Sequence, residues 1–209
     1  FQELNSYMYQ SAGAEMIESI AECIDKPLIR RTIVGKPVEL GLDYKQTTND
    51  EVEDLFELLK EVKVRFPEVT AVSSGAILST YQKNRVEAVC GRLGLVSLAP
   101  LWKRDQEELL TEMVSSGVNA VLVRVATYGL YERHLGKSIG ELHDYLIGLQ
   151  KKHDCHCCGE GGEFESLVLD SPFYRKRIEL TETSVVVESK NDLLFSGRLA
   201  VLKHKVIPK

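Results

Sequence analysis

Segments with helical periodicity alternate with short apolar segments over most of this chain, and this alternation constrains the fold more than any single motif. Strands are predicted at 28–33, 69–72, 95–98, 120–123 and 166–169. Helices are predicted at 7–24, 50–65, 79–93, 105–115 and 138–152. Because strands that are joined by helices usually pair in parallel through right-handed crossovers, we expect a parallel sheet covered by helices. The sequence therefore predicts a layered α/β fold.

The pattern changes after residue 165. Strand character and short connections are found in segments 174–180, 184–189 and 197–207. Short connections favour antiparallel pairing, so we expect an antiparallel or mixed element at this end of the chain. The least arbitrary domain boundary lies near Pro100, which predicts one domain over 1–100 and a second over 101–209.

The start of the helix predicted at 50–65 carries a local signal. Thr48 lies three residues before Glu51, which is the spacing of a capping box. We therefore expect the Thr48 side chain to cap this helix.

Composition excludes several function classes. The 209 residues carry a net charge of −5 and are 44% hydrophobic and 27% charged, as in a soluble globular protein. The acidic balance argues against a non-specific grip on nucleic acid, which needs clustered Lys and Arg. No apolar run approaches the ~20 residues that span a bilayer, so no membrane partner is expected. The five cysteines are odd in number, which predicts a reducing cytoplasm rather than a disulfide framework.

The segment Cys158–Glu165, called the Gly–Glu segment below, contains three glycines and three glutamates in eight residues. Glycine lets a backbone turn tightly and approach a ligand closely. Crowded carboxylates repel one another, and they supply negative charge or acid/base capacity. The segment lies between a predicted helix and a predicted strand, where binding groups are often placed. An ordinary acidic surface turn is the alternative interpretation.

Two other segments follow predicted strands. Ser73–Ala76 leads toward a helix, and its small residues suit a nucleotide or phosphate at the helix N-terminus. A plain strand–helix turn is the simpler interpretation of that segment. Ala126–Leu130 follows the strand at 120–123, and Tyr128 in it either presents its ring to a ligand or packs in the core. Since ligands gather beyond the carboxyl ends of parallel strands, both segments are candidate binding loops.

Five histidine and cysteine side chains are crowded into residues 153–158. Cys155 and Cys158 have the spacing of a zinc-binding pair, but a closed tetrahedral site usually needs a second pair, and none is visible. Cys155 and Cys157 would point the same way from a strand, and Cys23 and Cys90 lie on predicted core helices. We therefore expect core cysteines and no metal ligand, with zinc as the minor alternative.

Taken together, the motifs resemble those of the diphthine–ammonia ligase family. The segments that carry the resemblance are Leu4–Gln10, Pro27–Thr32, Gly75–Gln82 with Arg85–Glu87, Leu101–Gln106, Gly129–Leu130, His134–Lys137, Cys158–Glu165 and Asp170–Phe173. They occur in the family's order and cover nearly the whole chain. Their joint occurrence is highly specific.

The resemblance implies a fold and a reaction. The family belongs to the PP-loop ATP pyrophosphatases, which implies a Rossmann-like (HUP-type) parallel sheet with helices on both faces for residues 1–100. A smaller substrate-binding α/β domain with mixed or antiparallel strands is implied for 101–209. The implied activity is amidation of diphthine on translation elongation factor 2, which consumes ATP with Mg²⁺ and ammonium and gives diphthamide, AMP and pyrophosphate through an acyl-adenylate. No tightly bound cofactor is expected.

Candidate site residues follow from the resemblance and from the chemistry of the substrates. Diphthine carries a trimethylammonium group and the second substrate is ammonium, so a negative, partly aromatic pocket is expected. As a hypothesis, the carboxylates that hold a cation or take its proton are Glu160, Glu163 and Glu165. The candidates for the nucleotide are Ser74, Gly75, Gln82 and Arg85. The candidates for the substrate are Trp102, Arg104, Tyr128, Gly129, Gly159, Gly161, Gly162 and Phe164.

Two departures from the family pattern qualify these expectations. The Ser-Gly-Gly-Lys-Asp-Ser phosphate loop is absent, since the chain begins where the family sequence has passed that loop, and Thr80 stands where many relatives carry Asp. We expect a piece of a longer ligase. A non-catalytic homologue that binds nucleotide or elongation factor is the alternative, and a zinc-dependent hydrolase is a distant third.

Overall fold

The computed structural model describes residues 6–190 and 194–209 of the chain. These residues form two compact units. Residues 6–9 and Ile29–Arg104 make up one, called the N-terminal unit, and Gln10–Leu28 with Asp105–Lys209 make up the other, called the C-terminal unit. The chain therefore passes between the units three times.

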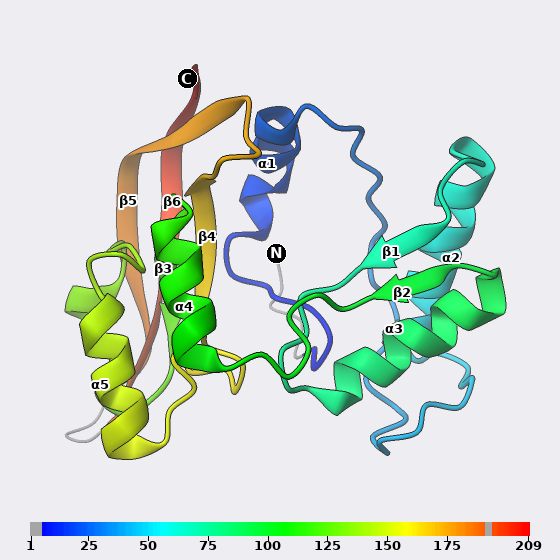
Figure 1. Ribbon diagram of the computed structural model, residues 1–209, viewed down its shortest axis with the longest axis horizontal. Helices are drawn as coiled ribbons and strands as arrows, with labels where there is room; N and C mark the ends of the chain where they lie inside the picture. The colour runs from blue at the N-terminus through cyan, green and yellow to red at the C-terminus, as the bar shows by residue number, and fades with distance from the viewer. Residues whose placement is uncertain (1–5, 191–193) are drawn as a thin grey trace. The chain divides into compact units, whose positions relative to one another are not determined.

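The N-terminal unit is built on a two-stranded parallel sheet. Its elements are α2 (Glu51–Arg65), β1 (Ala71–Ser73), α3 (Thr80–Leu93) and β2 (Val96–Leu98) (Figure 1). Ala71 pairs with Val96 and Ser73 with Leu98. Helix α3 connects the two strands, which confirms the predicted parallel pairing through a helix for this part of the chain. The full parallel sheet implied by the resemblance is not present in the described residues.

Helix α2 is capped by Asp50 rather than by Thr48, so the predicted capping box is wrong. Asp50 Oδ1 accepts a hydrogen bond from the backbone N–H of Val52 at 3.0 Å. Asp50 Oδ2 accepts from the N–H groups of Val38 and Glu39 at 3.0 and 2.8 Å. One carboxylate therefore caps the helix and holds a loop against it, which a threonine hydroxyl three residues from Glu51 does not do.

The surroundings of two glutamates in α2 shift their pKa values in opposite directions. Glu51 is fully buried, and burial raises the pKa of its carboxyl. Glu53 accepts two hydrogen bonds from the Arg92 guanidinium, both 2.8 Å, and one from the Tyr44 hydroxyl. The Arg92 bonds lower the pKa of Glu53.

We expect Glu51→Gln to stabilise the protein at neutral pH and Glu53→Gln to destabilise it. The raised pKa of folded Glu51 means that the parent loses stability as pH rises from the ordinary value of 4.5 through the raised one. That loss is about 1.4 kcal/mol for each pH unit between the unfolded-state and folded-state pKa values. Glu53 has the opposite sign, since its lowered pKa contributes stability that is lost as pH falls from 4.5 through the lowered value. For this partly exposed pair we expect at most about 1 kcal/mol.

The single tryptophan, Trp102, lies in the N-terminal unit, so its fluorescence can follow urea unfolding of both variants at about pH 4.5 and about pH 8. The two variants should differ from the parent in opposite directions at the higher pH and approach it at the lower one. The same sign of change in both would contradict the assignment.

The C-terminal unit contains an antiparallel four-stranded sheet. Its strands are β3 (Asn119–Val125), β4 (Phe164–Asp170), β5 (Lys176–Lys190) and β6 (Phe195–Pro208), in the order β4-β3-β6-β5. The antiparallel or mixed C-terminal element is thus confirmed, although 174–180 and 184–189 lie largely in one strand. Parallel pairing of the strand at 120–123 is wrong, because both neighbours of β3 follow it in the sequence and return antiparallel beside it.

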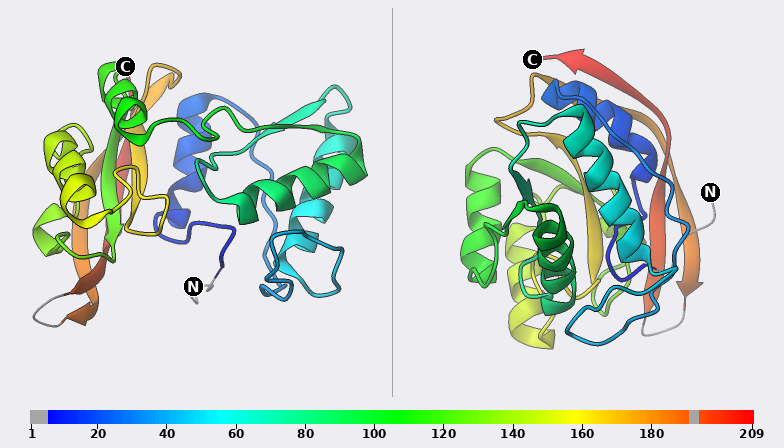
Figure 2. Two further views of the ribbon diagram at one scale, coloured as in Figure 1. Left: turned by 60° about the horizontal axis from the view of Figure 1, so that its bottom comes forward. Right: turned by 90° about the vertical axis from the view of Figure 1, so that its right-hand side faces the viewer.

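Helices and short helical turns cover this sheet. They are η1 (Ala14–Met16), α1 (Ile17–Ile24), α4 (Gln106–Ser115), η2 (Glu132–His134) and α5 (His143–His153). Helix α1 packs against β5 and β6, and α4 packs against α5 (Figures 1 and 2). Residues 120–123 are buried without alternation. Successive side chains of a strand point to opposite faces, so both faces of β3 are covered.

Three predicted elements differ from the structure. The helix predicted at 7–24 begins only after Gly13, which takes a left-handed conformation with φ 78°; a 3-10 turn starts at Ala14 and α1 at Ile17. Residues 28–33 follow Pro27 and form no strand, since they lie where the chain passes from one unit to the other. The helix predicted at 138–152 begins at His143, because Ser138 makes an isolated bridge with Val121.

Every helix in the described residues is too short or too polar to cross a bilayer.

Candidate functional site

The Gly–Glu segment follows a loop from α5 and enters β4 at Phe164. Asp154, with a left-handed backbone, ends α5. Glu163 turns its carboxylate back to the start of the loop, where Oε1 accepts the backbone N–H of His156 at 2.8 Å. Its Oε2 is buried and has no hydrogen-bond partner in the part of the chain that the structure describes. Glu163 therefore closes the loop with one oxygen, while the other has no hydrogen bond to the described residues.

The three predicted glutamates do not share one environment. Glu165 lies in β4, where its Oε2 accepts the backbone N–H of Ala12 at 3.0 Å and its Oε1 pairs with Arg124 at 3.2 Å. Arg124 also pairs with Glu188 at 3.3 Å. Glu160 is half-buried and has interactions of its own. Of the three, Glu163 is the one with a buried carboxylate oxygen that accepts no hydrogen bond from the described residues.

The three glycines of the Gly–Glu segment differ in backbone conformation and in the space that a side chain would find there. Gly159 has φ 78°, and a Cβ there would lie 2.6 Å from the backbone oxygen of Phe164. A Cβ on Gly161 would lie 2.7 Å from a carboxylate oxygen of Glu163. Gly162 also has a positive φ, 82°, but its Cβ would meet open space. Phe164 is buried in the core of the C-terminal unit, so its ring packs there.

The cysteines near this segment are held by one residue of α4. The thiols of Cys157 and Cys158 both donate to the backbone oxygen of Gln106, at 3.2 and 3.4 Å, and its side-chain Oε1 accepts the Cys157 N–H at 2.8 Å. The interaction between the two neighbouring thiols raises the pKa of Cys158, which burial raises further, and it lowers the pKa of Cys157. The Cys158 thiol therefore stays protonated.

The prediction of core cysteines is confirmed for Cys23, Cys90 and Cys157, which are buried, whereas the loop holding Cys155 and Cys157 forms no strand. Within residues 6–190 and 194–209, no group of three or more His, Cys, Asp or Glu side chains is placed to hold a metal ion. The zinc interpretation of residues 153–158 has no supporting geometry in those residues.

The segment after β3 contains one exposed and one tightly packed candidate. Tyr128 is 46% exposed, and its ring meets that of His153 edge-on at 4.6 Å. Gly129 has φ 87°, and a Cβ there would lie 2.4 Å from a methyl carbon of Leu149. Its carbonyl accepts the Tyr145 hydroxyl at 2.6 Å. Gly129 thus serves the packing of α5 on this segment, while the Tyr128 ring is accessible.

The nucleotide candidates lie in the N-terminal unit. Ser74 follows β1, donates its N–H to Leu98 at 2.9 Å, and has a buried hydroxyl without a described partner. Gly75 is exposed, and a Cβ there would meet nothing within 4 Å. Gln82 lies in the first turn of α3, where its side-chain amide donates to the Tyr7 carbonyl at 3.2 Å. Ser74 and Gly75 thus lie at the carboxyl end of β1, as predicted.

Arg85 is fully buried, and its terminal nitrogens already serve the fold. They donate to the carbonyls of Tyr81, Gly41 and Glu39, the first two at 3.2 and 3.0 Å. Its guanidinium also lies 3.3 Å from the centre of the Tyr81 ring. Binding of a phosphate by Arg85 would require some of these bonds to break.

Trp102 and Arg104 lie near the end of the N-terminal unit. The ammonium groups of Lys83 and Lys103 lie 5.3 and 5.9 Å from the centre of the half-buried Trp102 ring. Arg104 donates its N–H to Leu101 at 3.1 Å and has further interactions. The Trp102 ring is therefore a cation-binding surface already occupied by lysines.

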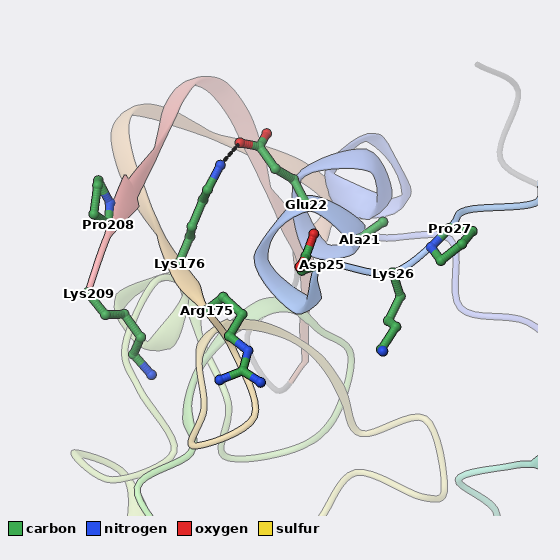
Figure 3. A pocket seen from close by; sticks show the side chains of 9 residues that line it. All are labelled: Ala21, Glu22, Asp25, Lys26, Pro27, Arg175, Lys176, Pro208 and Lys209. Atoms are coloured by element: carbon green, nitrogen blue, oxygen red, sulfur yellow. Dashed lines mark hydrogen bonds and ion pairs between the residues drawn. The ribbon is translucent and has the colours of Figure 1, made fainter.

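A pocket of about 660 Å³ lies elsewhere in the C-terminal unit, at the end of α1 (Figure 3). Its lining residues are Ala21, Glu22, Asp25, Lys26, Pro27, Arg175, Lys176, Pro208 and Lys209. Lys176 pairs with Glu22 at 2.8 Å, and Lys209 pairs with Asp170 at 2.6 Å. The pocket shares no residue with the predicted site.

Two residues that contact the Gly–Glu segment are absent from the predicted site. The sequence indicates His156 only as a possible zinc ligand, and Gln106 only as part of a motif. The position of His156, two residues before the Gly–Glu segment, is the signal that could have indicated it. Gln106 has no comparable signal, because its contacts join residues about 50 positions apart.

Two domain families match the sequence over most of its length. Residues 1–97 match the Diphthamide synthase N-terminal domain, and residues 105–200 match the Diphthamide synthase C-terminal domain. The chain belongs to the diphthamide synthase family. The family predicted from the motifs is thereby confirmed.

Individual members of the diphthamide synthase family are similar over nearly the whole chain. A diphthine–ammonia ligase of Schizosaccharomyces pombe is 51% identical over 203 residues, which are 97% of this chain and 34% of the relative. One from Danio rerio is 51% identical over 96% of this chain and 79% of the relative, and one from Homo sapiens 50% identical over 90% and 70%. The chain thus spans about a third of the fission-yeast relative and a larger share of the vertebrate ones.

Proposed function

We propose that this chain is part of a diphthine–ammonia ligase, which amidates diphthine on translation elongation factor 2 with ammonium. ATP, bound with Mg²⁺, is converted to AMP and pyrophosphate, and the product is diphthamide. The identity of about 50% to relatives named diphthine–ammonia ligase, over most of the chain, is the observation that carries the proposal. The protein would act in the cytoplasm, where translation provides its substrate.

The reaction sets clear demands on the site. A carboxylate is a poor electrophile, so it is first adenylylated, and ammonia then displaces AMP. The site must orient the reactants and exclude water that would hydrolyse the acyl-adenylate. Ammonium must also lose a proton before its nitrogen can attack.

The Gly–Glu segment supplies groups that meet these demands. Oε2 of Glu163, which is buried and accepts no hydrogen bond from the described residues, would accept a proton from ammonium, while Oε1 keeps the loop closed through His156. The exposed ring of Tyr128 offers a face for the trimethylammonium group of diphthine. Glu165 is occupied by Arg124, so its contribution would be to position β4.

The nucleotide would be bound by the N-terminal unit. The parallel strands β1 and β2 are joined by α3, as strands are in a Rossmann-like PP-loop sheet. On β2, the apolar residues Val96 and Leu98 are 58% and 48% exposed. Ser74 and Gly75 lie at the carboxyl end of β1, where such sheets bind ligands. Gln82 is the third nucleotide candidate, whereas Arg85 would support the site from within the fold.

The test is release of AMP and pyrophosphate by the full-length protein with ATP, Mg²⁺, ammonium and diphthine-bearing elongation factor 2. We expect release that depends on the modified factor, together with an amidated histidine detected by mass spectrometry. Binding of the factor without release would instead indicate a non-catalytic homologue.

A further inference from the structure

His156 has one ring nitrogen in a defined hydrogen bond and the other without one. Nδ1 accepts the backbone N–H of Cys158 at 3.2 Å. Because a backbone N–H can only donate, Nδ1 must present its lone pair, and the neutral imidazole then carries its proton on Nε2. Nε2 is buried, and no residue that the structure describes accepts its hydrogen bond. The local fold therefore selects the tautomer with the proton on Nε2, and this N–H group donates no hydrogen bond to the described residues.

Glu163 complements this donor with an unused acceptor. Its Oε1 is hydrogen-bonded to the backbone N–H of His156 itself, at 2.8 Å. Its Oε2 is buried and unpaired among the described groups, like Nε2 of His156. Buried polar groups nearly always have partners, so an unpaired donor and an unpaired acceptor on two hydrogen-bonded residues form a candidate ligand site. A ligand there would accept one hydrogen bond and donate another.

We propose that His156 is a catalytic residue of this site, whose Nε2–H donates to the acyl oxygen of the group being amidated. Glu163 Oε2 accepts a proton from the incoming ammonium. This inference rests on the proposed function and assigns it a residue beyond the glutamates. A carboxyl oxygen accepts and ammonium donates, so the two substrates together match the unpaired groups.

The chemical step balances with these two groups. Ammonium gives one proton to Glu163 and becomes ammonia, whose nitrogen attacks the acyl carbon. As the new C–N bond forms, negative charge develops on the acyl oxygen, where the His156 donor stabilises it. The bond from the acyl carbon to the AMP oxygen then breaks, AMP leaves with the electron pair, and the nitrogen gives a second proton to the departing phosphate, which leaves the amide.

A purely structural role makes a different prediction, and two substitutions separate the roles. In His156→Asn, the side-chain oxygen takes the place of Nδ1 and still accepts the Cys158 N–H, but the donor at Nε2 is lost. In His156→Gln, the amide N–H takes the place of the Nε2 donor, but the acceptor for Cys158 is lost. His204→Asn changes an exposed histidine of β6, outside the candidate site, and is the control.

We expect His156→Asn of the full-length protein to lower kcat by roughly 10² with little change in KM for the elongation factor. His156→Gln should retain more turnover than His156→Asn, and His204→Asn should match the parent. Nitrogen-15 NMR of His156 in the parent should show the proton on Nε2. The reverse order of the two variants, or a proton on Nδ1, overturns the inference.

Failure of the inference and failure of the proposed function look different. If the parent forms no amide, the proposed function is wrong, and this role of His156 falls with it. If the parent and His156→Asn form amide at the same rate, the function stands and the role of His156 is overturned.

Discussion

Glu163→Gln in the full-length protein is expected to lower amide formation by roughly 10²–10⁴, the contribution of a positioned general base. Glutamine keeps an oxygen that can accept the His156 N–H, so the loop should remain closed. It has no basic oxygen to take the proton from ammonium. The loss should therefore appear in kcat, with an unchanged melting temperature.

The division of the loss between turnover and stability distinguishes this role from simple loop closure. If Glu163 removes the ammonium proton, Glu163→Gln should lose kcat while its unfolding transition matches that of the parent. Glu165→Gln is the matched control, because Arg124 and Ala12 already occupy that carboxylate. We expect it to lower stability more than turnover. Equal kcat values for Glu163→Gln and the parent would rule out the base.

Gly159→Ala is expected to be the most destabilising single-methyl change in the Gly–Glu segment. Alanine at φ 78° costs about 1–2 kcal/mol. The added Cβ would also lie 2.6 Å from the backbone oxygen of Phe164, and relief of such overpacking costs about 1–3 kcal/mol more. For a chain of this size, each kcal/mol lowers the melting temperature by about 2–4 °C.

Gly162→Ala is the matched control for that change. Gly162 has a similar φ of 82°, but its Cβ would meet nothing within 4 Å. Only the backbone cost applies, so calorimetry should show a smaller loss than for Gly159→Ala. Equal losses at the two positions would mean that the contact with Phe164 relaxes freely.

Local signals predict the elements that depend on local interactions. Helices α2, α3 and α4 begin within one residue of their predicted starts, because apolar periodicity and polar caps are encoded in neighbouring residues. The Gly–Glu segment lies between a helix and a strand, as predicted, for the same reason. Parallel pairing of β1 and β2 follows from the connecting helix.

The features that local signals miss depend on contacts between distant residues. The burial pattern of β3 shows that both faces are covered, but not the direction of its neighbours. Asp50 caps α2 while it binds N–H groups 11 and 12 residues earlier. Glu165 is expected beside Glu163 in an acidic pocket, yet the register of β3 and β4 places it opposite Arg124. Strand pairing therefore gives Glu165 a charged partner, Arg124, which Glu163 does not have among the described residues.

The three passages of the chain between the units also set an order of folding. Residues 29–104 complete the N-terminal unit, but Met16 and Cys23 belong to the core of the C-terminal unit. That core also needs β3 to β6, which are synthesised much later. Helix α1 has eight residues, too few to be stable alone. During synthesis, residues 10–28 therefore leave the ribosome before residues 29–104, but they pack into their unit only after residues 29–104 have been made.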